Sequence, residues 1–270
     1  MVATPIGNLE DISSRAMKVL GEVGDVLAED TRHTRQLFNR LGIQARLHAL
    51  HDHNEERKVR HWLSVLGEGT DLALVSDAGT PLINDPGFRL VRSAREEGIR
   101  VSPVPGPCSP VAALSACGLP TDRFVFDGFL PHKSVARRGR LAELGRDTRT
   151  VVMLESSHRV RDTVMDIVEV LGGGRGLVLA KELTKLHEAV MGADADSVLA
   201  WLDADPARLK GEFVLILEGA PSAPEGGVGA DALIDALAGE LPASKLARVV
   251  SRLTGLDRKQ AYQRILERDR

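Results

Sequence analysis

The residues best suited to chemistry lie in a loop that is dense in glycine, proline and carboxylate. Segment 74–87 reads Leu-Val-Ser-Asp-Ala-Gly-Thr-Pro-Leu-Ile-Asn-Asp-Pro-Gly. It overlaps an apolar run, 71–76, that has the length of a buried strand, and it precedes 88–95, whose apolar spacing predicts a helix. Ligands of α/β sheets bind beyond the carboxyl ends of strands. The loop therefore predicts a ligand site; the alternative is a polar turn that only connects a strand to a helix.

Two further segments have the same organisation. Residues 2–12 run from a short apolar start through a Pro/Gly loop into a helical stretch at 12–20, and 101–110 leads into a helix at 111–117. Three such loops imply one pocket lined by several of them, and the absence of G-x-G-x-x-G and P-loop patterns argues against dinucleotide and P-loop sites. Only two or three residues precede the first loop, so a strand there is unusually short and we expect the start to have lost some residues.

The elements that would position these loops alternate between strand and helix, which favours an α/β fold. We expect an N-terminal α/β domain over 1–118 and a second over 119–219, separated by a turn cluster at 118–122. A helix with one apolar face is predicted from 160 to 171, ending at the glycines of 172–176. The clearest predicted strands are 25–29, 72–75, 100–104, 124–129, 150–154, 177–180, 188–191 and 212–217, with a basic helix from about 134.

The last part of the chain is predicted to be a separate helical appendage. A Gly/Pro-rich linker occupies about 220–230, and amphipathic segments 245–253 and 258–266 within 231–270 flank a turn at 254–257. Two short helices around a glycine turn form a helix-turn-helix pattern. We expect this appendage to bind RNA or, alternatively, to serve packing or dimerisation.

Composition excludes several classes of protein. No stretch of the 270 residues approaches the ~18 apolar residues of a membrane span, and no signal peptide is expected. Cys108 and Cys117 lie in or beside an apolar run, which favours buried thiols in a reducing cytoplasm. Aromatic content of 3%, with a single tyrosine, Tyr262, argues against an RNA-stacking platform.

Charge is unevenly distributed around a net value of −3. Residues 131–149 carry six basic side chains against two acidic ones, and residues 243–268 carry seven against two. Such local excess predicts either contacts to phosphates or solvated helix faces. The basic residues are Lys133, Arg137, Arg138, Arg140, Arg146 and Arg149 in the first run and Lys245, Arg248, Arg252, Arg258, Lys259, Arg264 and Arg268 in the second.

A set of motifs then points to a known family. ATPIGNL (3–9), AEDTRHT (28–34), LHDHNE (50–55), VSDAGTPLINDPG (75–87), PVPGPCS (103–109), DRFVFDGFLPHK (122–133), ESSHR (155–159) and KGEFVLILEG (210–219) occur in this order. From residue 2 to its end the chain resembles the ribosomal RNA small subunit methyltransferase I family of the tetrapyrrole-methylase fold class. The resemblance implies two α/β domains with a cofactor cleft between them. It also implies S-adenosylmethionine-dependent 2′-O-methylation of a cytidine in the decoding region of small-subunit (16S) rRNA, within the assembled or assembling subunit, by a homodimer.

The same resemblance implies a set of cofactor-binding residues. The first loop, Ala3-Thr-Pro-Ile-Gly7, departs from the G-x-G-D-P pattern of many corrin methylases. The cofactor contacts that the resemblance implies are Pro5, Asp77, Gly79, Thr80, Pro81 and Ser109, with Leu154 closing the cleft from the second domain.

Methylation of a 2′-hydroxyl is helped by a base, because an alcohol gains acidity as the new bond forms. The candidate bases are the carboxylates Glu29, Asp30 and Glu155, together with His33 and His158. Alternatively, Glu29 or Asp30 caps a helix that starts near Thr31. The residues expected to contact RNA are Arg32, Arg35, Lys133, Arg137, Arg138, Arg159, Arg258 and Lys259.

No metal site is expected. His48, His51 and His53 lie near Asp52, and on a strand 51 and 53 would share a face, but no cysteine or second histidine cluster completes a ligand set. Polar residues within 182–188 either shape the pocket of the methyl acceptor or pair across strands.

Two other functions compete with rRNA methylation. A corrin-precursor methyltransferase would require neither the basic stretches nor the appendage. An RNA-binding assembly factor without turnover would not require an intact loop set, and here Gly79 and Gly106 remain glycine.

Overall fold

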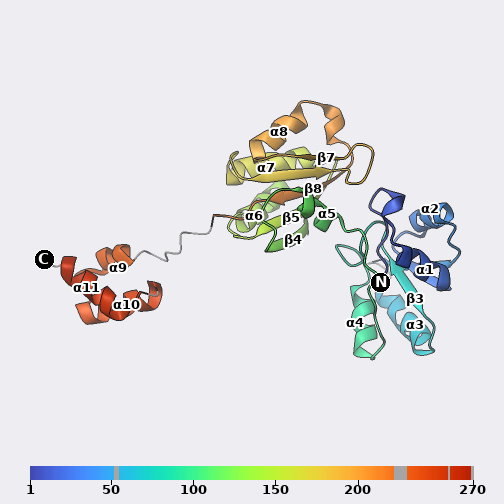
Figure 1. Ribbon diagram of the computed structural model, residues 1–270, viewed down its shortest axis with the longest axis horizontal. Coiled ribbons are helices and arrows are strands. Elements are labelled where there is room, and N and C mark those ends of the chain that lie inside the picture. The colour runs from blue at the N-terminus through green and yellow to red at the C-terminus, as the bar shows by residue number, and fades with distance from the viewer. Residues whose placement is uncertain (52–54, 222–229, 255, 269–270) are drawn as a thin grey trace. The chain divides into compact units, whose positions relative to one another are not determined.

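The computed structural model describes residues 1–51, 55–221, 230–254 and 256–268. The chain divides into two compact units, Met1–Gly219 and Ala220–Arg270 (Figure 1). Within the described residues, the strands form a three-stranded and a five-stranded sheet, both in the first unit. Helices long and apolar enough to span a membrane are absent from the described part of the chain.

The smaller sheet is parallel, with the order β2-β1-β3. Its side chains alternate between two buried faces, as the period of a strand requires. Val26 and Val75 pack with α1 and α2 on one face, whereas Leu27 and Leu74 pack with α3 and α4 on the other. The elements are α1 (Ser14–Glu22), β1 (Asp25–Ala28), α2 (Thr31–Leu41), β2 (Arg46–Ala49), α3 (Glu55–Gly67), β3 (Leu72–Val75) and α4 (Phe88–Glu96), preceded by the 3-10 turn η1 (Leu9–Asp11).

The strand predicted at 100–104 is not formed. Of this segment only Val104 makes a β-bridge, with Val2, and Thr4 makes another with Gly79. Pro103 and Pro105 flank Val104, and proline has no N–H to contribute to a ladder. Val104 is buried, at 6% exposed, but its neighbours in the segment are half-buried or exposed.

The larger sheet has the order β4-β5-β8-β6-β7 and is mixed: β4 and β5 are parallel, and the remaining pairs are antiparallel. This agrees with the predicted strands to within a few residues at their ends. The elements are α5 (Ser109–Ala116), β4 (Phe124–Phe129), α6 (Ser134–Leu144), β5 (Thr150–Ser156), α7 (Val160–Leu171), β6 (Leu177–Lys181), β7 (Ala189–Met191), α8 (Ala195–Asp203), the 3-10 turn η2 (Pro206–Leu209) and β8 (Glu212–Leu217).

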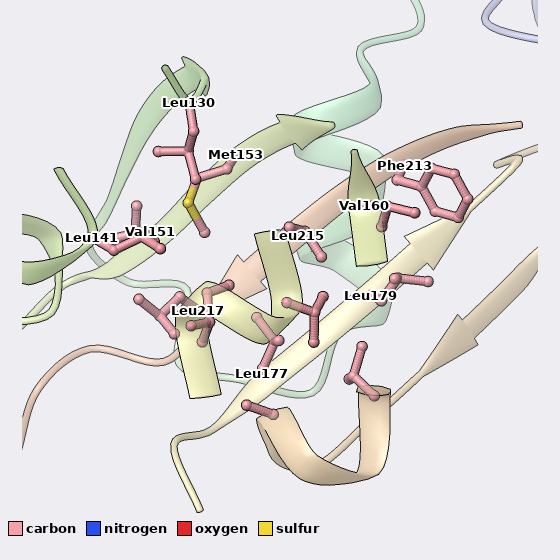
Figure 2. Close-up of a cluster of buried hydrophobic side chains, with 14 of the residues drawn as sticks. Leu130, Leu141, Val151, Met153, Val160, Leu177, Leu179, Phe213, Leu215 and Leu217 are labelled. Atoms are coloured by element: carbon pink, nitrogen blue, oxygen red, sulfur yellow. The ribbon is translucent and has the colours of Figure 1, made fainter. Parts of the chain in front are cut away.

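Helices cover both faces of the larger sheet. On one face Met153, Leu179 and Leu215 pack with residues of α6, α7 and α8 (Figure 2). On the other face Val152, Val214 and Ile216 pack with Ala113 and Leu114 of α5. The expected boundary at 118 separates the strands of the two sheets, but by its packing α5 belongs with the second sheet.

The second unit consists, in its described part, of α9 (Ala230–Leu237), α10 (Ala243–Thr254) and α11 (Arg258–Arg268) around a small core that includes Ile234, Val250 and Ile265. The sequence predicted α10 and α11 but not α9, whose eight residues follow the predicted linker. Most of that linker, 222–229, lies outside the described residues.

Candidate functional site

Three loops that follow apolar strand-like segments meet at one end of the smaller sheet. The backbones of Thr4 and Gly79 exchange hydrogen bonds in both directions, at 2.9 and 3.1 Å. The hydroxyl of Thr80 donates to the carbonyl of Pro107 at 2.9 Å. The predicted convergence of the 2–12, 74–87 and 101–110 segments is therefore confirmed.

The 77–87 loop also reaches the larger sheet. Leu82 and Asn84 have left-handed backbones, with φ of 73° and 70°, which is costly for residues other than glycine and is typical of functional loops. Opposite Asn84 lies Gly128 of β4, where a Cβ would sit 2.7 Å from the Asn84 Oδ1. Glycine at 128 thus allows the loop to approach β4 closely.

A cavity of about 500 Å³ opens where these loops face the larger sheet. Its wall contains the carboxyl end of β5, the start of β8, and side chains from all three loops. Both apolar side chains and carboxylates line it. The lining residues used below are Ile6, Glu29, Asp77, Ile83, Asn84, Asp85, Ser109, Phe129, Leu154, Glu155, Leu183 and Phe213.

The expected cofactor residues divide into two groups in this geometry. Asp77, Ser109 and Leu154 line the cavity directly. Pro5, Gly79, Thr80 and Pro81 are not in its wall; Gly79 and Thr80 hold the loops together through the hydrogen bonds described above. Phe129 and Phe213 also line the cavity and were not among the expected contacts. Both lie in quoted family motifs, DRFVFDGFLPHK and KGEFVLILEG, which were the signal that could have pointed to them.

A second hollow, of about 420 Å³, lies along β3 and residues 99–104. Its wall includes apolar side chains such as Leu27, Leu74 and Val101, and it shares none of the catalytic candidates. The chemistry-bearing residues gather at the cavity between the loops and the larger sheet.

Asp30 caps α2 and is a poor base. Its carboxylate accepts from the backbone N–H of Arg32 at 2.8 Å, as an N-cap residue does, and from the Arg32 guanidinium. These hydrogen bonds hold the pKa of Asp30 well below its ordinary value. A general base works best with a pKa near the operating pH. The capping alternative therefore applies to Asp30, whereas Glu29 lines the cavity.

Glu155 lies in the cavity wall, but its carboxylate is committed to the protein. Its side chain is 0% exposed and accepts from the Thr163 hydroxyl at 2.7 Å, the Ser156 N–H at 2.8 Å and the Arg159 guanidinium at 3.0 Å. Arg159 also donates to the carbonyl of Leu130 at 2.7 Å and is only 15% exposed. We therefore assign this cluster to holding the end of β5 against α7, with Arg159 unavailable to phosphate.

Comparison with known proteins places the chain in a family. Residues 1–199 match the model of the tetrapyrrole (corrin/porphyrin) methylases, and 224–269 match that of the RsmI C-terminal HTH domain. A ribosomal RNA small subunit methyltransferase I of Escherichia coli O157:H7 is 52% identical over 99% of this chain and 94% of its own length. The chain belongs to the ribosomal RNA small subunit methyltransferase I family.

Another family member supports this assignment, and two solved structures share the fold. The Pseudomonas aeruginosa relative of the same name is 48% identical over 99% of this chain and 96% of its own length. The crystal structure of the methyltransferase CobJ is 18% identical and covers 81% of this chain and 93% of its own, with a TM-score of 0.58. That of diphthine synthase is 12% identical and covers 80% and 88%, with a TM-score of 0.59. The last two show a shared fold, and the predicted fold class is confirmed.

The basic run at 131–149 of this family member is largely neutralised within the fold. Arg137 is buried and pairs with Asp166 at 2.6 Å, and Arg138 pairs with Asp166 at 2.6 Å and with Glu169. Arg140 pairs with Asp127, and Arg149 pairs with Asp147 at 2.7 Å. Arg137 is therefore removed from the expected RNA contacts. Lys133, which precedes α6, is exposed and stays a predicted contact. The charge count could not reveal this, because Asp166 and Glu169 lie outside the run.

The second basic run keeps more exposed charge. Arg264 and Arg268 of α11 pair with Asp231 of α9 at 3.4 and 3.7 Å. Arg258 and Lys259 are exposed in the first turn of α11, which Asp257 caps. On α2, Arg32 is 84% exposed beside Asp30, and Arg35 is exposed.

The remaining polar clusters are structural by their contacts. Lys185 pairs with Glu182 at 2.9 Å and with Glu212 at 3.0 Å. These contacts join the end of β6 to the start of β8, which agrees with the alternative that residues within 182–188 pair across strands. His48 pairs with Asp25 at 2.7 Å. No group of metal-ligating side chains is found among the described residues, and His53 lies outside them. Both cysteines are free thiols, Cys117 buried and Cys108 partly exposed.

Proposed function

We propose that this chain is an S-adenosylmethionine-dependent methyltransferase that modifies the 2′-hydroxyl of a cytidine in the decoding region of 16S rRNA. The observation that carries the proposal is the family membership, which extends over both the methylase region and the C-terminal unit. The relatives are named as methyltransferases of small-subunit rRNA, and we extend that activity to this chain. We place it in the cytoplasm, on the assembled or assembling small subunit.

The cavity suits S-adenosylmethionine in size and chemistry. A volume of about 500 Å³ lies within the usual range of ~300–1,000 Å³ for sites of small ligands. Ile6, Phe129 and Leu183 offer apolar contact for an adenine ring, while Asp77 and Asp85 offer acceptors for amino and hydroxyl groups. When bound, the cofactor supplies a methyl group activated by a sulfonium. The chain's own residues bind and orient it, and they exclude water from the transfer.

The decisive experiment uses small ribosomal subunits from a strain that lacks the enzyme, with isotopically labelled S-adenosylmethionine. We expect label in 16S rRNA at one cytidine, in a form that resists alkaline cleavage because its 2′-oxygen is methylated. Label on the base would contradict the 2′-O assignment. Label transferred to a uroporphyrinogen or precorrin and not to rRNA would instead favour the corrin-type alternative.

The second unit is expected to supply affinity for RNA rather than chemistry. Truncation after Gly219, where the first unit ends, should leave cofactor affinity intact and weaken subunit binding. The dependence of log affinity on log salt should become shallower, because fewer counterions are released. Replacing Arg258 and Lys259 with alanine should lower the slope by roughly one unit for each lost phosphate contact.

The matched control is the double variant Arg264→Ala/Arg268→Ala, which removes two charges already paired with α9. In this variant the slope of log subunit affinity against log salt concentration should stay close to that of the wild type. If truncation lowers thermal stability while the salt slope is unaltered, the unit is a packing appendage and not an RNA-binding one.

We further propose a homodimer, which would present two basic surfaces to one large RNA partner. Light scattering at micromolar protein should give about twice the chain mass of 29.1 kDa. A mass of one chain under these conditions would contradict the proposal.

A further inference from the structure

A third hollow adjoins the cavity, and one residue, Asp77, lines both. It has a volume of about 230 Å³ and is lined by Leu9, His33, Gln36, Leu37, Arg40 and Asp77. His33, Gln36, Leu37 and Arg40 are three and four residues apart, so they occupy one face of α2. Asp77 lines both spaces, so a group in the hollow and a ligand in the cavity both lie next to Asp77.

Asp77 is held so that it can orient His33. Its Oδ1 accepts from the backbone N–H of Asp30 at 3.0 Å, and its Oδ2 lies 3.1 Å from the His33 Nδ1. A carboxylate only accepts, so a neutral His33 in this contact carries its proton on Nδ1 and leaves the Nε2 lone pair free to accept a proton. The His33 side chain is 63% exposed and is therefore accessible to a substrate.

We propose that this hollow is the subsite for the target nucleotide and that His33 is the base that takes the proton of the acceptor hydroxyl. The inference rests on the proposed function. Arg40 is exposed at one end of the face and suits a phosphate of the target strand, and Gln36 suits the edge of a base. Leu9 and Leu37 supply the apolar contact of a ribose.

The step balances with His33 as the base, and two of the three candidate carboxylates are already engaged by the protein. The hydroxyl proton moves to Nε2 and the hydroxyl oxygen forms a bond to the transferred methyl. The electron pair of the broken bond stays on the donor sulfur, and the imidazolium that results faces the Asp77 carboxylate. Asp30 is held ionised by Arg32, and the oxygens of Glu155 are occupied by Arg159, Thr163 and Ser156. Asp77 is thus a positioning residue and His33 a catalytic one.

The first test measures the arrangement without turnover. In the free protein labelled with ¹⁵N, the His33 ring should show the tautomer with its proton on Nδ1, and Asp77→Asn should abolish that preference. A proton on Nε2 in the wild type would overturn the assignment, because the nitrogen that faces the hydroxyl would then be a donor.

The second test measures turnover and binding separately on purified small subunits. His33→Asn should lower the single-turnover rate at saturating subunits by ~100-fold or more, with affinities for the subunit and for S-adenosylmethionine within two-fold of the wild type. Arg40→Ala should instead weaken subunit binding and lower the salt slope by about one. Arg95→Ala, an exposed arginine of α4 on the other side of the smaller sheet, is the charge-matched control and should change neither quantity.

Two results would overturn the proposal. If His33→Asn keeps its full methylation rate and Glu29→Gln loses it, the base is Glu29 and not His33. Equal binding by the Arg40→Ala and Arg95→Ala variants would show that the nucleotide binds elsewhere. If the wild-type protein does not methylate rRNA at all, the proposed function fails. The His33 tautomer and the subunit affinities of Arg40→Ala and Arg95→Ala still test the subsite in that case.

Discussion

Gly79→Val is expected to weaken the binding of S-adenosylmethionine ten-fold or more without unfolding the protein. Gly79 has a φ of +85°, where a β-branched residue is strained by about 1–3 kcal/mol. An added Cβ would also lie 3.3 Å from the Cγ2 of Ile6, a residue of the cavity wall. Relief of either strain shifts the loop that carries Asp77, so the cavity changes shape. Calorimetric titration measures the affinity, and circular dichroism verifies the fold.

A control variant separates backbone strain from the geometry of the cavity. Gly98 follows α4 with a φ of +75° and has no atom within 4 Å of an added Cβ. Gly98→Val should therefore destabilise the fold to a similar degree while cofactor affinity stays unchanged. Equal affinities for the two variants would show that the Gly79 loop does not shape the cofactor site.

The framework of this site could be predicted from sequence because its signals are local. Each loop carries its own glycines and prolines after an apolar run, and the carboxyl ends of parallel strands meet at one edge. Asp77, in the loop that follows such a run, lies in the cavity wall, and so do Ser109 and Leu154, which only the family resemblance had implied as cofactor contacts. The same local reasoning anticipated that Asp30 caps α2, as the alternative to catalysis.

What could not be predicted depends on contacts between distant segments. A count of basic residues over 131–149 cannot reveal that Asp166, on another helix, neutralises Arg137 and Arg138. Likewise, the position of Asp77 against His33 depends on how the loop after β3 packs on α2, 44 residues earlier in the chain. At 100–104 the predicted strand is wrong, although Val104 is buried, because the prolines on either side of Val104 cannot contribute to a ladder.

The buried pair between Arg137 of α6 and Asp166 of α7 should contribute measurably to the stability of the first unit. Arg137→Met keeps the apolar stem of the side chain but leaves the buried Asp166 with one guanidinium partner fewer. Asp166 keeps the Arg138 guanidinium and the Ser134 hydroxyl as partners, so the expected cost is that of one lost hydrogen bond to a charged group, about 1.5–3 kcal/mol. We expect urea unfolding, followed through Trp201 at the edge of the same core, to show a loss of that order. The affinity of the folded variant for the ribosomal subunit, measured without urea, should be unchanged.

An exposed pair provides the comparison. Arg149 is 44% exposed beside Asp147, so Arg149→Met should cost only about 0–1 kcal/mol. Reduced subunit affinity of Arg137→Met at unchanged stability would instead return Arg137 to the RNA-binding surface.

The difference in unfolding free energy between the wild type and Arg137→Met should also depend on pH. Burial raises the pKa of Asp166, but hydrogen bonds from Arg138 and Arg137 outweigh it and hold the pKa below its ordinary value. A carboxyl group whose pKa is lower in the folded state stabilises the protein above its unfolded pKa of about 3.9, and this contribution is lost as the pH falls through the folded value. The stability gap between the wild type and Arg137→Met should therefore be widest near neutral pH and narrow in acid, as Asp166 becomes protonated in both folded proteins. A gap that is unchanged at acid pH would mean that the loss arises from packing of the arginine stem, because protonation of Asp166 would then have no effect on it.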